Sequence, residues 1–312
     1  MFFRNLTLFR FPAMAIDANA LSDALSKHRI RELGPIEVKT SGFLPPCSAD
    51  LNGDQLVYAT AGSPMLVCLG IAEKILPATV INEALSRKVR EIAERDNRRV
   101  GAKERKRLKD EVVTDLLPRA FSRQKTIRAY LDAVGGWLVV DTGSRKAAED
   151  VVTQLRVALG SFPARPLAPE ESPRAIFTHW MNTSERPSDV SLGNECELRE
   201  PSEDGGKWLG RKVDLESDDV REHLRSGMQA VKVGLVLNQR LGFTLGEDLS
   251  VGKLKLLVES EADGESNADI FASEFALLTL EVRNLQAALG RIFRIGEVGL
   301  EDQRVEEPRL AA

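Results

Sequence analysis

Hydrophobic residues recur along the chain with two different periods, which together predict a mixture of strands and helices. Alternation of apolar and polar positions, typical of strands, occurs at 2–11, 55–61, 65–71, 127–134, 137–141, 230–237, 241–245 and 254–258. Helical spacing of apolar positions occurs at 17–33, 79–92, 108–116, 144–159, 217–227 and 270–293. We interpret the acidic stretch 195–204 as rich in loops. The pattern predicts an α+β fold with mixed or antiparallel sheets.

Glycine, proline and capping residues mark the boundaries between these elements. Gly135 and Gly136 separate two of the strand-like segments, and paired glycines tolerate the positive φ angles of a two-residue hairpin turn. Thr79 is a candidate N-cap, and Gly160 ends the helix predicted at 144–159. Prolines at 163, 166, 169 and 173 indicate a linker between two subdomains.

Apolar residues almost disappear between Ala93 and Arg107, where two helical segments meet. We predict that these helices form a basic hairpin, called the finger, which protrudes from the body. About twenty helical residues would give it a length of roughly 30 Å. The predicted organisation is a central α/β region at 1–76 plus 126–165, the finger at 77–125, a second α/β region at 166–296 and a disordered tail at 297–312.

Charge is strongly segregated along the chain, although the 312 residues carry a net charge of only -4. Between Arg87 and Arg128 there are fifteen Lys and Arg residues and seven Asp and Glu residues, a net charge of +8. The other 270 residues carry 28 basic and 40 acidic groups, a net charge of -12. A basic finger on an acidic background is therefore expected.

Several functional classes lack their sequence signals. The glycine-rich phosphate-binding motifs of ATPases and dinucleotide enzymes are absent, and the three histidines are scattered, so we expect no cofactor and no metal site. Cys47, Cys68 and Cys196 lie far apart, as is typical of reduced thiols. No apolar run approaches the roughly 20 residues of a membrane span, and Arg4 and Arg10 interrupt the apolar start, so a cytoplasmic protein without a membrane partner is predicted.

Carboxylates offer one route to catalysis. Asp132 and Asp141 lie near opposite ends of the predicted hairpin, and Glu149 and Asp150 follow on the next helix. Metal-dependent nucleases use such acidic sets to hold divalent cations. With 47 acidic residues in the chain, the alternative is that these side chains are solvated or act as caps.

The basic window has two interpretations. Duplex DNA carries one negative charge per roughly 1.7 Å of its axis, so a 30 Å finger faces on the order of eighteen phosphates. Fifteen cations could meet them, and without stacking aromatics between Arg87 and Ala120 they would recognise phosphates and not sequence. The alternative is a solvated hairpin whose charges keep it soluble. Phe121 stands among these cations, and either folds back into the hairpin or is exposed to contact a partner subunit.

Several segments, in the same order, resemble the bacterial family of recombination-associated proteins RdgC. They are Glu73-Lys-Ile-Leu-Pro77, Lys109-Asp-Glu-Val112, Leu116-Leu-Pro-Arg-Ala-Phe-Ser-Arg123, Ala147-Ala-Glu-Asp150, Leu159-Gly-Ser161, Glu203-Asp-Gly-Gly206 and Asp214-Leu215. The resemblance extends from the start of the chain to about Gly296.

This resemblance implies a ring-shaped homodimer whose basic hole admits duplex DNA without sequence specificity. It also implies a nucleoid protein that restrains RecA recombinase by occupying DNA and has no catalytic activity. The family's finger-tip phenylalanine and a lysine meet across one dimer contact, and these correspond to Phe121 and Lys212. The family pattern has glutamine after that lysine, where this chain has Val213, so a more apolar contact is expected.

The residues expected to supply the DNA-facing potential are Lys103, Arg105, Lys106, Arg107, Lys109, Arg119 and Arg123. Two other functions stay open at this point. One is a metal-dependent nuclease that uses Asp132 and Asp141, and the other is a protein-binding adaptor whose basic arm contacts acidic partners.

Overall fold

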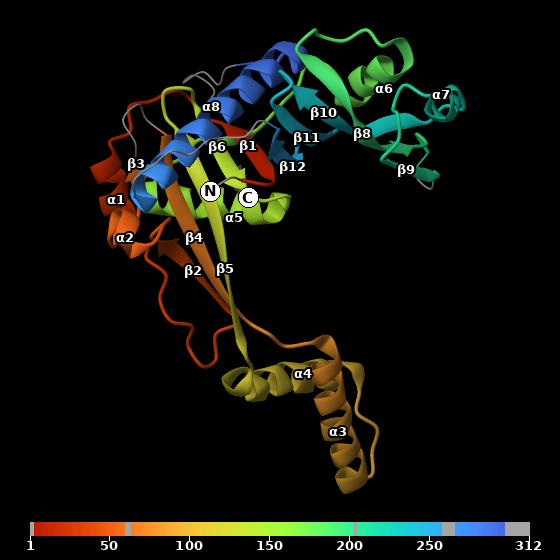
Figure 1. Cartoon of the computed structure of the whole chain (residues 1–312). Helices are drawn as coiled ribbons and strands as arrows, with labels where there is room; N and C mark the ends of the chain where they lie inside the picture. The colour runs from red at the N-terminus through yellow and green to blue at the C-terminus, as the bar shows by residue number, and fades with distance from the viewer. Residues whose placement is uncertain (1–2, 60–63, 203–204, 258–265, 297–312) are drawn as a thin grey trace, which may run out of the picture. The chain divides into compact units, whose positions relative to one another are not determined.

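The computed structural model describes residues 3–59, 64–202, 205–257 and 266–296 of the chain (Figure 1). These residues form two compact units. Unit 1 comprises 1–25, 45–67 and 127–312, and unit 2 comprises 26–44 and 68–126. The predicted tail at 297–312 lies outside the described residues, and the domain boundaries predicted above stay a prediction.

Unit 1 contains a large antiparallel sheet, as the α+β prediction requires. Its strands are β1 (Leu6–Arg10), β3 (Tyr58–Ala59), β6 (Trp137–Asp141), β7 (Arg165–Pro166), β8 (Val190–Arg199), β9 (Lys207–Arg211), β10 (Gln229–Leu237), β11 (Leu241–Gly246) and β12 (Val251–Leu256). β4 (Pro64–Lys74) and β5 (Ser122–Asp132) contain residues of both units. The strand order is β5-β6-β1-β12-β11-β10-β8-β9, and each neighbouring pair is antiparallel.

The helices of unit 1 are α1 (Ala18–Ser26, whose last residue belongs to unit 2), α2 (Ala49–Asn52), α5 (Arg145–Leu159), α6 (Pro173–Thr183), α7 (Asp218–Arg225) and α8 (Asn267–Phe293). All of these helices except α2 bury apolar side chains on one face. Leu278, Val282 and Leu285 of α8 pack in one core with Leu6 and Leu8 of β1. Truncating one such buried leucine to alanine costs about 2–5 kcal/mol.

The β5–β6 hairpin and α5 confirm two predicted elements, but the hairpin turn spans four residues, 133–136, and not the predicted two. Gly136 has φ +67°, and a Cβ atom there would lie 2.4 Å from the carbonyl oxygen of Phe11, so the turn requires glycine. Ser144 caps α5 by accepting a hydrogen bond from the Ala147 N–H, and Gly160 ends the helix with φ +73°.

Unit 2 consists of a small strand pair and two helices. β2 (Lys39–Leu44) pairs with β4 from Lys39 opposite Glu73 to Leu44 opposite Cys68. After β4 the chain forms α3 (Ala78–Asp96), α4 (Ala102–Leu116) and the 3-10 turn η1 (Leu117–Arg119) before it enters β5.

Two predicted elements differ because long-range contacts override local signals, and Thr79 is not an N-cap, since α3 begins at Ala78 after Pro77. The stretch at 195–204 was interpreted as loop, yet Glu195 and Glu197 belong to β8. Each forms ion pairs, Glu195 with Lys253 and Glu197 with Arg199 and Lys207, so the acidic residues are tolerated in the strand. The helix predicted at 17–33 ends at Ser26, because the backbone at His28 and Ile30 hydrogen bonds with Phe43 of β2. All three cysteines are free thiols.

Candidate nucleic-acid interface

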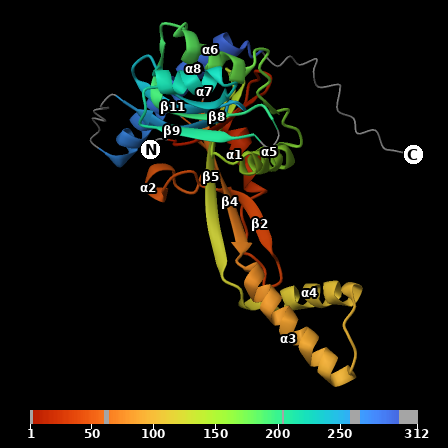
Figure 2. The ribbon, with the colours of Figure 1, turned by 90° about the vertical axis from the view of Figure 1, so that its right-hand side faces the viewer.

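The predicted finger corresponds to α3 and α4 of unit 2, which lie at an angle to each other in both views (Figures 1 and 2). Few apolar side chains hold them together, since only Leu85 of α3 and Leu108 and Val112 of α4 are buried. Lys88 adds a polar connection, because its Nζ lies 3.2 Å from the Glu111 carboxylate and 3.5 Å from that of Asp115. The predicted helical hairpin thus has a small core and a largely exposed surface.

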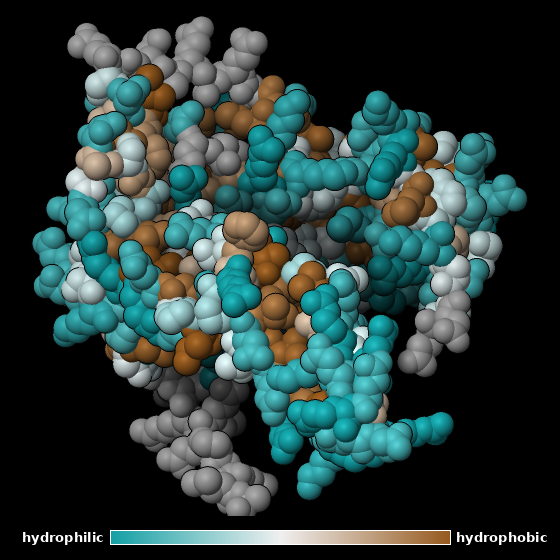
Figure 3. All heavy atoms as spheres, turned by 90° about the horizontal axis from the view of Figure 1, so that it is seen from below, coloured by the Kyte–Doolittle hydropathy of each residue, from teal (hydrophilic) through white to brown (hydrophobic). Residues whose placement is uncertain are grey.

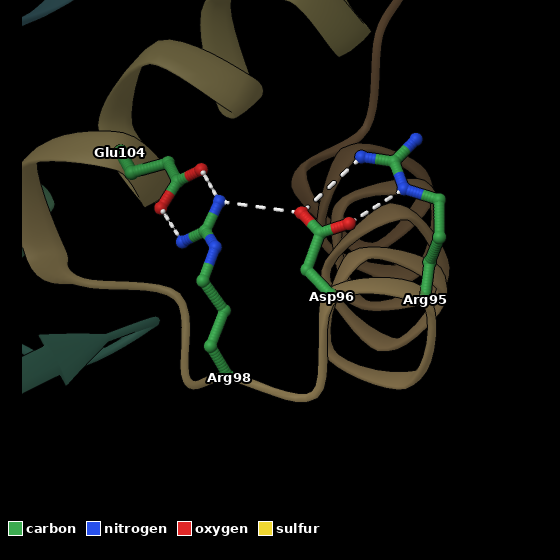
Figure 4. Close-up of polar contacts among 4 residues, drawn as sticks. All are labelled: Arg95, Asp96, Arg98 and Glu104. Carbon is green, nitrogen blue, oxygen red and sulfur yellow. Dashed lines mark hydrogen bonds and ion pairs between the residues drawn. The ribbon is translucent and has the colours of Figure 1, made fainter.

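The turn between α3 and α4 is fixed by a chain of ion pairs (Figure 4). Both terminal nitrogens of Arg98 donate to the Glu104 carboxylate at 2.7 Å, and Arg98 also lies 3.6 Å from Asp96. Asp96 in turn accepts from Arg95 Nε at 2.8 Å. The hydrogen bond from Arg98 lowers the pKa of Glu104, and that from Arg95 lowers the pKa of Asp96. Asn97 supplies the left-handed residue that ends α3, with φ +46°.

The cations of α4 remain largely uncompensated. Lys103, Arg105, Lys106 and Lys109 are exposed, and none forms an ion pair within the described part of the chain. Lys103 and Lys106 are three residues apart, and Arg105 and Lys109 are four apart, so each pair projects from one side of the helix. Like charges at this spacing destabilise a helix by a few tenths of a kcal/mol. An anion bound between them would remove that cost.

The remaining predicted cations differ in how much of their charge is available. Arg107 is exposed and lies 3.5 Å from Glu111 on the same helix. Arg119 is exposed on η1 and has no ion pair among the described residues. Arg123 is held by Glu73 at 2.5 Å, and Lys125 contacts the same Glu73 oxygen at 2.8 Å. Sequence reasoning missed the role of Glu73, because it lies fifty residues from Arg123.

Glu73 should show an abnormal titration. Hydrogen bonds from Lys125 and Arg123 lower its pKa from 4.5 to about 2. Because the folded-state pKa is depressed, the contribution of this contact to stability is present above pH 4.5 and is lost as the pH falls through about 2. Carboxyl-detected NMR is expected to give a Glu73 midpoint near 2, moving toward 4.5 in Lys125→Ala. A midpoint near 4.5 in the native protein would contradict the contact.

Phe121 is 85% exposed, so it does not fold back into the hairpin. Its carbonyl oxygen accepts a hydrogen bond of 2.7 Å from the N–H of Ile75, which is itself 45% exposed. Phe121 therefore lies where the chain leaves α4 for β5, at the base of the helical hairpin and not at its turn. Figure 3 shows a face on which hydrophilic side chains predominate and hydrophobic residues are visible between them.

Lys212 and Val213 follow β9 in unit 1. Lys212 is exposed and has φ +57°, a left-handed conformation that is uncommon for a residue with a side chain. The N–H of Val213, the next residue, donates to the Asn194 carbonyl at 3.1 Å, which holds this short segment against β8.

The two candidate catalytic aspartates have protein partners. Asp132 is 2% exposed. Its carboxylate accepts one hydrogen bond of 2.7 Å from Arg283 and a second of 3.2 Å from the Gly135 N–H. Asp141 accepts from the N–H groups of Arg4 and Asn5, and burial raises its pKa. In the part of the chain that is described, no group of three or more His, Cys, Asp or Glu side chains could hold a metal ion. None of the described helices is both long and apolar enough to cross a membrane.

Comparison with known proteins gives a consistent family match. A family profile described as "Putative exonuclease, RdgC" matches residues 1–295. A Recombination-associated protein RdgC from Xanthomonas campestris pv. campestris (strain B100) is 42% identical over 292 residues, which cover 91% of this chain and 95% of the relative. Proteins of the same name from Xanthomonas axonopodis pv. citri and Xylella fastidiosa are 41% and 39% identical, with the same coverage.

Proposed function

The chain belongs to the RdgC family of recombination-associated proteins, and from this membership we propose that it binds duplex DNA without sequence specificity. In this proposal it encircles the duplex as a ring-shaped homodimer and restrains RecA-dependent recombination by occupying DNA. It acts in the cytoplasm, at the nucleoid, without a cofactor and without catalysis.

The observation that carries the proposal is the set of uncompensated cations on the finger. Lys103, Arg105, Lys106 and Lys109 are exposed on one helix, in pairs that repel each other unless an anion lies between them. Regularly spaced phosphates are such anions, and contacts to phosphates carry no sequence information. Arg107, Arg119 and Arg123 complete the proposed DNA-facing set, in which Arg123 contributes least because Glu73 compensates its charge.

The proposed dimer contact uses Phe121 on one protomer and Lys212 with Val213 on the other. An 85% exposed phenylalanine is costly to leave in water, and large aromatic side chains are common at the energetic centre of interfaces. The left-handed Lys212 is a second indication, because strained backbone conformations cluster at functional positions. In a two-fold dimer the same contact would occur twice and close the ring.

Titration of duplex binding against salt tests the DNA-binding proposal directly. If Lys103, Arg105, Lys106, Lys109 and Arg119 each neutralise one phosphate, the log-log slope is roughly -4.5 per protomer. Duplexes of unrelated sequence should bind equally well. A flat salt response would favour the adaptor alternative. Binding to an acidic protein that duplex DNA does not displace would favour it as well.

The description of the matching family profile names an exonuclease, which gives a second candidate. A divalent cation at Asp132 would have to displace the guanidinium of Arg283, which lies 2.7 Å from the carboxylate. Incubation of end-labelled duplex with magnesium distinguishes the two functions. Shortening of the DNA that disappears in Asp132→Asn and Asp141→Asn would establish the nuclease and refute a purely binding function.

A further inference from the structure

Unit 1 contains a basic cleft that the DNA-binding proposal does not use. It lies between the β5–β6 turn and α8, near the end of that helix, and has a volume of about 500 Å³. This is within the range of about 300–1,000 Å³ that small ligands occupy. The cleft is lined by Arg10, Asp132, Val134, Gly135, Trp137, Arg283, Gln286, Ala287 and Ile295.

Two arginines and one aspartate give the cleft a net positive charge. Arg10 stacks on Trp137, with its guanidinium carbon 4.4 Å from the ring centre, and donates to the Gly135 carbonyl at 2.7 Å. Arg283 donates to Asp132 through Nε alone, and its side chain is 43% exposed. The other guanidinium nitrogens of Arg283 have no hydrogen-bond acceptor among the described residues. They form a fixed pair of donors suited to a carboxylate or another oxyanion.

Gln286 supplies a second hydrogen-bond donor to the cleft. Its side chain is 4% exposed, and its amide nitrogen has no hydrogen-bond partner among the described residues. A buried donor left unpaired costs about 1–3 kcal/mol. Gln286 follows Arg283 by three residues on α8, so both side chains line the cleft from one side of the helix.

The rim of the cleft is apolar. Val134, at the tip of the β5–β6 turn, is 74% exposed, and Ile295 lines the cleft just after the end of α8. A ligand that fits both the arginine donors and the apolar rim carries a negative charge next to an apolar group. Trp137 is buried and covered by Arg10, so it offers no open ring face on which a nucleobase could stack. These features favour a peptide over a nucleotide.

We propose that this cleft binds an acidic peptide segment of another protein, with a carboxylate on Arg283 and a neighbouring aliphatic side chain against Val134. The site is independent of the finger. It would give this protein a way to recruit or recognise a partner while DNA is bound elsewhere.

Binding of a fluorescein-labelled peptide, Asp-Glu-Asp-Leu-Val, tests the proposal by fluorescence anisotropy on the full chain. Both peptides are amidated at the C-terminus; we expect saturable binding, and at least about tenfold weaker binding of Asn-Gln-Asn-Leu-Val, which has no side-chain carboxylates, because charge-assisted hydrogen bonds are lost. Val134→Glu places a negative charge on the exposed rim and should also weaken binding at least about tenfold. Arg283→Gln removes the donors and should act in the same direction.

Val157→Glu is the matched control, since Val157 is 55% exposed on α5 and does not line the cleft. Its affinity for the peptide should equal that of the unmodified protein. Val134→Glu changes only a surface residue, so it remains informative if Arg283→Gln unfolds. Equal affinity for the acidic and neutral peptides, or an unchanged affinity in Val134→Glu, would overturn the proposal. Displacement of the peptide by duplex DNA would also overturn it and assign the cleft to nucleic acid.

Discussion

Combined replacement of Lys103, Arg105, Lys106 and Lys109 by alanine is expected to abolish most duplex binding. Four phosphate contacts contribute about 3.6 to the log-log salt slope of each protomer, so at 0.1 M salt, relative to 1 M, their counterion release corresponds to about four thousandfold in affinity. The four side chains are exposed and alanine has the highest helix propensity, so α4 should stay folded. The measurement is duplex affinity between 50 and 300 mM salt, with circular dichroism to verify the helices.

A control of opposite sign is available on α3. Glu91 and Glu94 are exposed and form no ion pair among the described residues. Neutralising them in Glu91→Gln/Glu94→Gln raises the charge of the finger by two and should tighten duplex binding. If the alanine variant kept the original salt slope, or if the glutamine variant bound more weakly, the finger would not be the surface that meets phosphates.

Phe121→Ser is expected to separate the dimer into monomers. Burying one phenylalanine side chain contributes about 1.5–3 kcal/mol. In a two-fold dimer with two such contacts, their loss amounts to about 3–6 kcal/mol, which weakens dimerisation at least a hundredfold. Duplex affinity should fall with it, because an open or monomeric form cannot enclose DNA. Sedimentation equilibrium over a range of protein concentrations measures the first effect, and the salt titration measures the second.

Val157→Ser is the matched control for this variant, because it also removes an exposed hydrophobic side chain. The far-ultraviolet circular dichroism spectrum should be unchanged in both variants, since neither residue belongs to the buried core. A Phe121→Ser protein with the dimer mass and duplex affinity of the original would refute the interface role. That result would not contradict the proposal that the finger binds phosphates, because the substitution does not change α4.

Much of the fold could be predicted where neighbours in the chain decide the structure. The β5–β6 hairpin, the helix α5 that ends at Gly160 and the apolar stripe of α8 each depend on local backbone conformation or helical periodicity, and these elements are confirmed, although the hairpin turn is two residues longer than predicted. β8 was missed because Glu195 and Glu197 look like loop residues until Lys253 and Lys207, on other strands, compensate them.

The candidate site was predicted less completely than the fold. The sequence identified the basic residues of the site, but it did not show which of them are free of ion pairs within the protein. Glu73 compensates Arg123, whereas Lys103 and Lys106 remain unpaired within the described residues. The sequence also left open whether Phe121 is buried, and only the structure shows that it is exposed.

The sequence alone determined the family, the separation of a +8 window from a -12 background and the helices that carry it, because charge and periodicity are properties of the chain itself. Tertiary structure decided which charges are free, that Phe121 is exposed, and that Arg10, Asp132 and Arg283 line one cleft. Ion pairing, exposure and clefts depend on distances between residues far apart in the chain, and only folding sets those distances.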